Sequence, residues 1–112
     1  MEAVRRLPPR LKVLTLGPEG ALAFLGEGEV RVPGVRVRVV DTVGAGDTFT
    51  AGLLALLLRR GGGRGVLEGL DLEGLREALE AAVALSALAC TVRGAGLPEE
   101  GLAAWRARWL AG

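Results

Sequence analysis

The 112-residue sequence contains no histidine, no asparagine and no glutamine, and its only cysteine is Cys90. Without histidine, neither a histidine-containing catalytic triad nor an ordinary zinc site can be built. A single cysteine excludes an internal disulfide. Asparagine, glutamine, methionine and cysteine are depleted in thermophilic proteins, so the composition indicates either a thermophilic source or a GC-rich genome that favours Ala, Gly, Leu and Arg codons.

Blocks of like charge and long apolar runs are also missing. The 14 basic and 13 acidic residues nearly cancel, which argues against nucleic acid or an anionic membrane as a partner. The longest apolar run of the central helical region, residues 53–58, is too short to cross a bilayer, and the N-terminus lacks the apolar core of a signal peptide. We therefore expect a cytoplasmic protein with no membrane or nucleic-acid partner.

The length and the apolar content of 50% predict one domain, residues 1–112, with a buried core. Residues 1–10 carry two prolines, which cannot donate ladder hydrogen bonds, and are interpreted as a lead-in segment. Tight turns are expected at residues 17–20 and 26–28, the second of them closing a β-hairpin. Alternating valine and arginine at residues 35–40 predict a strand with one wet face. Strands are thus expected at residues 11–16, 21–25, 29–32 and 35–40.

Helices are expected at about residues 47–60, at residues 72–92 and from Pro98 onward. Asp71 is a plausible N-cap of the second helix, and residues 64–70 are expected to connect it flexibly to the first. Leu72, Leu75 and Leu79 should point inward, and the apolar second half of that helix should be buried between other elements. The two tryptophans of the last helix are interpreted as packing residues rather than a stacking platform for bases. The pattern predicts an α/β fold, a layered sheet with flanking helices.

The turn that joins residues 35–40 to the first helix has the sequence Asp-Thr-Val-Gly-Ala-Gly-Asp-Thr-Phe at residues 41–49. Gly44 and Gly46 permit unusual dihedrals, and the first N–H groups of a helix have no intrahelical partner, which makes such a place bind anions. Asp47 is hard to explain as an anion-binding residue and indicates a proton acceptor; the alternative is an acid that stabilises the first helical turn. The turn is neither a Walker A loop nor a dinucleotide fingerprint.

Residues 41–49 closely resemble the motif of the ribokinase-like carbohydrate kinases, also called the phosphofructokinase-B family. Residues 15–20, Thr-Leu-Gly-Pro-Glu-Gly, resemble the nucleotide loop of that family, and residues 91–96, Thr-Val-Arg-Gly-Ala-Gly, resemble its C-terminal Gly-Ala loop. The resemblance covers nearly the whole chain but only the C-terminal part of such a kinase. It implies the C-terminal, nucleotide-binding portion of a ribokinase-like fold and phosphorylation of a sugar or sugar-acid hydroxyl by ATP with Mg²⁺, aided by K⁺ in many relatives.

By this resemblance, Asp47 accepts the proton of the sugar hydroxyl, while Gly44, Ala45 and Gly46 offer backbone N–H groups to the transferred phosphoryl group. The positions that line the nucleotide are Thr15, Gly17, Gly20 and Val83; taken alone, the first three also suit a hairpin turn. The positions that hold a monovalent cation in many relatives, largely through carbonyl oxygens, are Asp41, Val43, Ala89, Val92 and Gly94. Asp41 is equally suited to cap its own turn by accepting backbone N–H groups.

The chain departs from the family pattern in several places. Thr50 and Val83 stand where many relatives have asparagine, the second of these near the adenine, so the resemblance does not extend to adenine recognition. No Asn-x-x-Glu element, N-terminal sugar-binding region or lid is present. We therefore expect the chain to form a homo-oligomer or to be completed by the missing N-terminal part. Three functions stay open: a sugar kinase, a nucleotide-binding module without turnover, and a vestigial structural domain.

Overall fold

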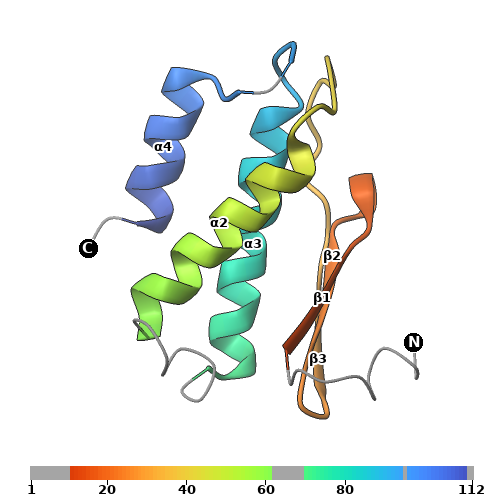
Figure 1. Cartoon of the computed structure of the whole chain (residues 1–112), viewed down its shortest axis with the longest axis vertical. Helices are drawn as coiled ribbons and strands as arrows, with labels where there is room; N and C mark the ends of the chain where they lie inside the picture. Colours follow the sequence, from red (N-terminus) through yellow and green to blue (C-terminus); the bar gives the residue numbers. More distant parts are fainter. Residues whose placement is uncertain (1–10, 62–69, 95, 111–112) are drawn as a thin grey trace.

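A computed structural model describes residues 11–61, 70–94 and 96–110. The expected lead-in segment and nearly all of the expected connector at 64–70 lie outside the described residues. The elements are β1 (Leu11–Thr15), a short 3₁₀ helix (Gly17–Glu19), β2 (Ala21–Leu25), β3 (Gly28–Val32), α2 (Ala45–Gly61), α3 (Leu72–Ala89) and α4 (Glu99–Trp109) (Figure 1).

The three strands form an antiparallel meander in the order β1-β2-β3. Leu11 pairs with Leu25 at one end of the first ladder, and Ala21 pairs with Val32 in the second. All five residues of β2 are buried. The expected hairpin and the two expected turns, at residues 17–20 and 26–28, are thus confirmed, and one face of the sheet packs against α3 (Figure 1).

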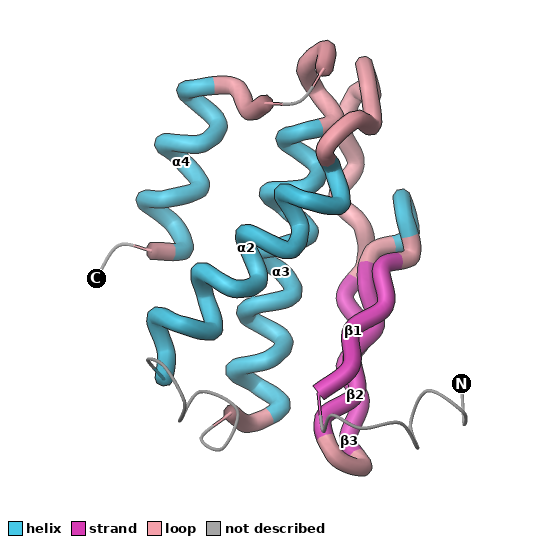
Figure 2. Tube along the Cα trace, viewed as in Figure 1, coloured by secondary structure: helices cyan, strands magenta, loops and turns pink. Residues whose placement is uncertain are grey.

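The strand predicted at residues 35–40 is absent, because this segment runs as a loop from β3 to α2 (Figure 2). Val35, Val39 and Val40 are 50%, 60% and 52% exposed. Alternation of valine and arginine suits a strand, but a strand also needs a neighbour to pair with, and the sheet among the described residues ends at β3. The N–H groups of Val40 and Asp41 instead donate to the Cys90 carbonyl at 2.7 and 3.2 Å.

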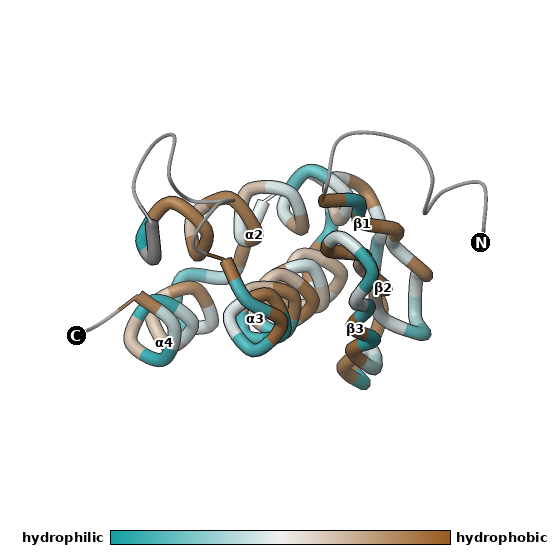
Figure 3. The backbone as a smooth tube through the Cα atoms, turned by 90° about the horizontal axis from the view of Figure 1, so that it is seen from below, coloured by the Kyte–Doolittle hydropathy of each residue, from teal (hydrophilic) through white to brown (hydrophobic). Residues whose placement is uncertain are grey.

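The helix α3 lies at the centre of the fold, with the sheet on one side, α4 on the other and α2 across it (Figures 1 and 3). Its N-cap is Asp71, as predicted, whose carboxylate accepts the Gly74 N–H at 2.7 Å. Leu75 and Leu79 are fully buried as expected, whereas Leu72, in the first turn, is 42% exposed. The helix ends at Ala89, three residues before the expected end at Val92.

Two contacts fix the helices against one another. Gly52 of α2 is buried against α3, where a Cβ would lie 3.2 Å from the Leu85 side chain and 3.3 Å from the Ala82 backbone. Trp105 of α4 is 6% exposed, and its indole N–H donates to the Ala81 carbonyl at 2.8 Å. The expected packing role of Trp105 is therefore confirmed. Among the described residues, no helix combines the length and the apolarity that crossing a bilayer requires.

Candidate functional site at the start of α2

Helix α2 begins at Ala45, two residues before the predicted start. Gly44 precedes it with a φ of 80°, a left-handed conformation that favours glycine. The Ala45 N–H donates to the Thr42 carbonyl at 3.2 Å, and the Thr48 N–H donates to the Gly44 carbonyl at 2.9 Å. The N–H groups of Gly46 and Asp47 belong to the first turn of α2, and no preceding helical turn supplies carbonyl acceptors for them. They are therefore the unpaired donors that begin a helix. An anion is favoured at such a helix end.

The Thr48 side chain also bonds to the backbone of this first turn. Its hydroxyl lies 2.9 Å from the Gly44 carbonyl and 3.0 Å from the Ala45 carbonyl, and it donates toward these two oxygens. A β-branched threonine commonly bonds back to the preceding turn in this way. The glycine-containing turn is thereby held in one conformation by its own sequence neighbours.

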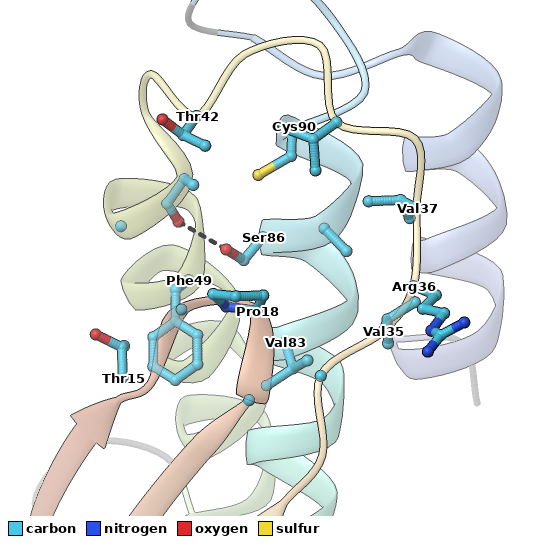
Figure 4. Close-up of a pocket in the computed structure, with 17 residues that line it drawn as sticks. Thr15, Pro18, Val35, Arg36, Val37, Thr42, Phe49, Val83, Ser86 and Cys90 are labelled. Carbon is cyan, nitrogen blue, oxygen red and sulfur yellow. Dashed lines mark hydrogen bonds between the residues drawn. The ribbon is translucent and has the colours of Figure 1, made fainter.

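A cavity of about 430 Å³ opens beside this helix end (Figure 4). It lies between the turn after β1, the loop after β3, the first turns of α2 and the second half of α3. Most of its walls are apolar or glycine, and Arg36 is the only charged residue among those that line it. The lining residues are Thr15, Gly17, Pro18, Gly20, Gly34, Val35, Arg36, Val37, Val39, Thr42, Ala45, Gly46, Phe49, Val83, Ser86, Ala87 and Cys90.

Six of the residues singled out from sequence share this cavity: Thr15, Gly17, Gly20, Ala45, Gly46 and Val83. They come from three regions of the chain, so the fold brings the expected nucleotide loop and part of the expected anion-binding turn together. Gly44 and Asp47 are not among the lining residues. Asp47 is exposed, and its carboxylate in the first turn of α2 is favourably placed for the helix dipole.

Sequence reasoning missed Phe49, Ser86 and Gly34, which also line the cavity. Phe49 is 6% exposed and belongs to the motif, but its role as a wall was not inferred. The Ser86 hydroxyl donates to the Ala45 carbonyl at 3.1 Å (Figure 4). A lone hydroxyl within an otherwise apolar helical stretch was the available signal for Ser86, since a polar group in a buried helix needs a partner.

Gly20 and Gly34 allow two backbone segments to approach closely at one edge of the cavity. A Cβ on Gly20 would collide with the Val32 carbonyl, and a Cβ on Gly34 would collide with the Pro18 carbonyl. Gly20 also has a φ of 108°. Glycine is therefore required at position 20 for a steric reason, because the backbone that leaves β3 lies so close to it.

Asp41 links the loop before α2 to the loop after α3. One carboxylate oxygen accepts the Val43 N–H at 3.1 Å, and the other accepts the Gly94 N–H at 2.9 Å. The Gly94 N–H, followed by those of Val43 and Thr42, lowers the pKa of Asp41 from its usual value. The turn-capping role considered for Asp41 is confirmed, and a second contact 53 residues away is added to it.

The expected cation positions are partly brought together by these bonds. Asp41, Val43 and Gly94 meet through the Asp41 carboxylate. Ala89 is the last residue of α3 and is 1% exposed, and Val92 lies beyond that helix and is partly buried. Across the described ranges, no group of three or more His, Cys, Asp or Glu side chains is arranged to hold a metal ion.

Comparison with known proteins places this geometry in a wider group. Residues 2–101 match the family described as pfkB family carbohydrate kinase. The chain is 47% identical over 95 residues to a probable chloroplastic fructokinase-6 of Arabidopsis thaliana, and the match covers 82% of this chain and 23% of the relative.

Two solved structures resemble the fold. Aminoimidazole riboside kinase from Salmonella enterica, complexed with aminoimidazole riboside and an ATP analog, gives a TM-score of 0.65 at 35% identity over 84% of this chain and 31% of that one. A fructokinase double mutant from Vibrio cholerae O395, with fructose, ADP and potassium bound, gives 0.64 at 33% identity over 76% and 26%. The chain thus spans less than a third of each of these three proteins.

Proposed function

The chain belongs to the pfkB family of carbohydrate kinases, and from this premise we propose that it supplies the nucleotide pocket, the anion-binding turn and the proton acceptor for ATP-dependent phosphorylation of a sugar or sugar-acid hydroxyl. One observation carries the proposal. Ala45 and Gly46 line the cavity, whereas Asp47, the next residue, is exposed and outside it. ATP bound in the cavity and a sugar hydroxyl beside the Asp47 carboxylate would therefore meet at the first turn of α2.

The cavity suits a nucleotide in size and character. Its volume of about 430 Å³ falls within the range of about 300–1,000 Å³ that small-molecule pockets usually have. Phe49 and Val83 offer apolar surface for a base, while Thr15 and Thr42 offer hydroxyl groups. The relative from Salmonella enterica was solved with an ATP analog, and the one from Vibrio cholerae with ADP.

The N–H groups of Gly46 and Asp47 are proposed to face the phosphates, with Gly44 and Ala45 shaping the turn. Phosphoryl transfer needs positioning and charge stabilisation more than covalent help, and oriented backbone dipoles supply both. Asp47 is proposed to accept the hydroxyl proton as that oxygen attacks the γ-phosphate. Its exposure leaves its carboxylate free to meet a substrate from outside the described fold.

Two metal ions, Mg²⁺ and K⁺, are proposed to accompany the reaction. Mg²⁺ would accompany ATP and neutralise phosphate charge, since the described residues offer no acidic cluster of their own for it. K⁺, which is bound in the Vibrio cholerae fructokinase structure, is proposed to lie between the loops that Asp41 joins. Each Asp41 carboxylate oxygen accepts one N–H group, and the carbonyls of Val43, Ala89, Val92 and Gly94 are proposed to supply most of the coordination.

Calorimetric titration of the chain with ATP, Mg²⁺ and K⁺ tests the nucleotide pocket. We expect measurable heat for the unmodified chain and at least a tenfold weaker affinity for Ala87→Phe, because Ala87 lines the cavity. Ala107→Phe is the matched control, since Ala107 is exposed on α4 and is not a lining residue. Equal affinities in all three proteins would refute the assigned pocket.

A second candidate is a module that binds nucleotide without turning it over. This candidate is favoured because the chain covers only 23% and 31% of the length of two relatives. Positioning of the sugar substrate accounts for much of such catalysis, and the chain represents only a minor part of a complete kinase. Binding of ATP without phosphorylation of any of a panel of sugars would support this module. The absence of binding would leave a structural domain, the third possibility.

A further inference from the structure

The loop between β3 and α2 forms one side of the cavity. Its residues that line the cavity are Val35, Arg36, Val37 and Val39, and Arg38 is not among them. In a strand, successive side chains point to opposite faces, so Arg36 and Arg38 would lie together on the face opposite the valines. Because the segment runs as a loop (Figure 2), Arg36 borders the cavity with its valine neighbours. The two arginines, both exposed, therefore have different surroundings.

Within the cavity, Arg36 lies away from the proposed anion-binding turn. Figure 4 shows Arg36 at the same end of the cavity as Val83 and Phe49, whereas Thr42, which comes shortly before the turn, lies at the opposite end. Phosphates that accept the N–H group of Gly46 would therefore leave the base of a nucleotide at the end where Arg36 lies. The guanidinium is accordingly placed to meet the base rather than the phosphates.

The walls at this end of the cavity differ in character. Phe49 and Val83 are 6% and 7% exposed, so they offer a fixed apolar surface that can cover one face of a flat base. Arg36 is a long, exposed side chain on the loop across the cavity from them. Its guanidinium is planar and weakly hydrated, and such a group stacks readily on the face of a π-system. A base bound against the apolar wall would present its second face to this group.

We propose that Arg36 is a nucleotide-binding residue whose guanidinium stacks on the outer face of the base, while Phe49 and Val83 cover the inner face. The assignment rests on the proposed function, because it requires a nucleotide in the cavity. Every base has a π-face, so stacking is tolerant of base identity. Arg36 therefore contributes affinity for ATP and GTP alike and does not select between them.

Calorimetric titration with ATP and Mg²⁺ tests this contact in Arg36→Ala, Arg36→Lys and Arg38→Ala. We expect Arg36→Ala to bind ATP roughly three- to tenfold more weakly, the effect of losing one stacked cationic side chain. GTP should lose affinity by the same factor. Arg36→Lys keeps the charge but not the planar group, so it should not restore the affinity. Arg38→Ala is the matched control, because it removes the same charge from the same loop at an exposed position outside the cavity lining.

Each outcome decides the proposal. Weaker binding of ATP by both Arg36 variants, with unchanged binding by Arg38→Ala, supports it. An equal loss in Arg38→Ala overturns it, since the effect would then be one of net charge. Full affinity in Arg36→Lys also overturns it, because the contact would then be an ion pair with the phosphates. If the unmodified chain binds no ATP, the proposed pocket fails together with this inference; if it binds ATP and Arg36→Ala binds equally well, this inference alone fails.

Discussion

The Ser86 hydroxyl on α3 donates to the carbonyl of Ala45, the first residue of α2, across 3.1 Å. This bond joins two helices at residues 41 positions apart and lies within the cavity wall. It fixes the start of α2 relative to α3, and therefore the position of the proposed anion-binding turn. The turn is set by contacts from outside its own motif as well as by its glycines.

Replacing Ser86 by alanine removes this bond. We expect the free energy of unfolding to fall by about 0.5–1.5 kcal/mol, the usual net worth of one hydrogen bond. The loss is limited because the Thr48 hydroxyl also donates to the Ala45 carbonyl at 3.0 Å. Urea denaturation measures the change. Thr50→Ala is the control, since the exposed Thr50 bonds only within its own helix, and a loss as large in that variant would contradict the assignment.

Gly20→Ala tests the close approach of the turn to the chain leaving β3. The new Cβ would collide with the Val32 backbone carbonyl, and the residue has a φ of 108°. We expect a destabilisation of about 3 kcal/mol or more, the upper end for point mutants, because backbone atoms must move. Gly17→Ala is the comparison, as Gly17 has a positive φ of 59° but open space around its Cβ position.

Thermal and urea unfolding of the two glycine variants should therefore differ. Gly17→Ala should cost about 1–2 kcal/mol, the penalty of a left-handed conformation for a residue with a Cβ. If both variants lost the same stability, the steric contact of Gly20 would have no energetic weight. The cavity should also change shape in Gly20→Ala, so nucleotide affinity should fall with stability in that variant.

Most of the local structure could be predicted from the sequence, because its signals lie within a few residues. The hairpin is bounded by glycine turns, and Asp71 caps α3 by bonding to a residue only three positions away. The strand predicted at residues 35–40 was wrong for the opposite reason, since pairing depends on a neighbour that the local pattern cannot reveal. The bonds of Ser86 and Asp41 to distant residues were likewise invisible.

The candidate site was predicted in its parts but not in its arrangement. Residues of the expected nucleotide loop and of the expected anion-binding turn do line one cavity. Their meeting depends on how the turn after β1 packs against the start of α2, which is tertiary information. The orientation of Asp47, one residue beyond Gly46 and outside that cavity, follows from the earlier start of α2 at Ala45, which sequence reasoning placed at residue 47.

Asp41 should act as a connector between two loops. Asp41→Ala removes the acceptors of both the Val43 and the Gly94 N–H groups, so its thermal midpoint should fall. Asp41→Asn retains one side-chain oxygen and should fall less. Hydrogen exchange at the Gly94 amide should become faster in both variants, and faster in the alanine variant. Unchanged exchange at Gly94 would show that the bond does not hold the loop in solution.

Asp47→Asn separates catalysis from folding and from nucleotide binding. Asp47 is exposed, so the free energy of unfolding should fall by no more than about 0.3–1 kcal/mol, the usual contribution of a carboxylate near a helix N-terminus. The affinity for ATP should also be retained, because the cavity excludes this side chain.

In a kinase completed by its missing part, the turnover rate of Asp47→Asn should fall by about 10²–10⁴-fold, the usual contribution of a general base. Turnover assays on the assembled enzyme measure this, with Thr50→Ala as the control on the same helix. A completed Asp47→Asn enzyme that turned over at the unmodified rate would refute the base assignment and leave Asp47 as an acid that stabilises the first turn of α2.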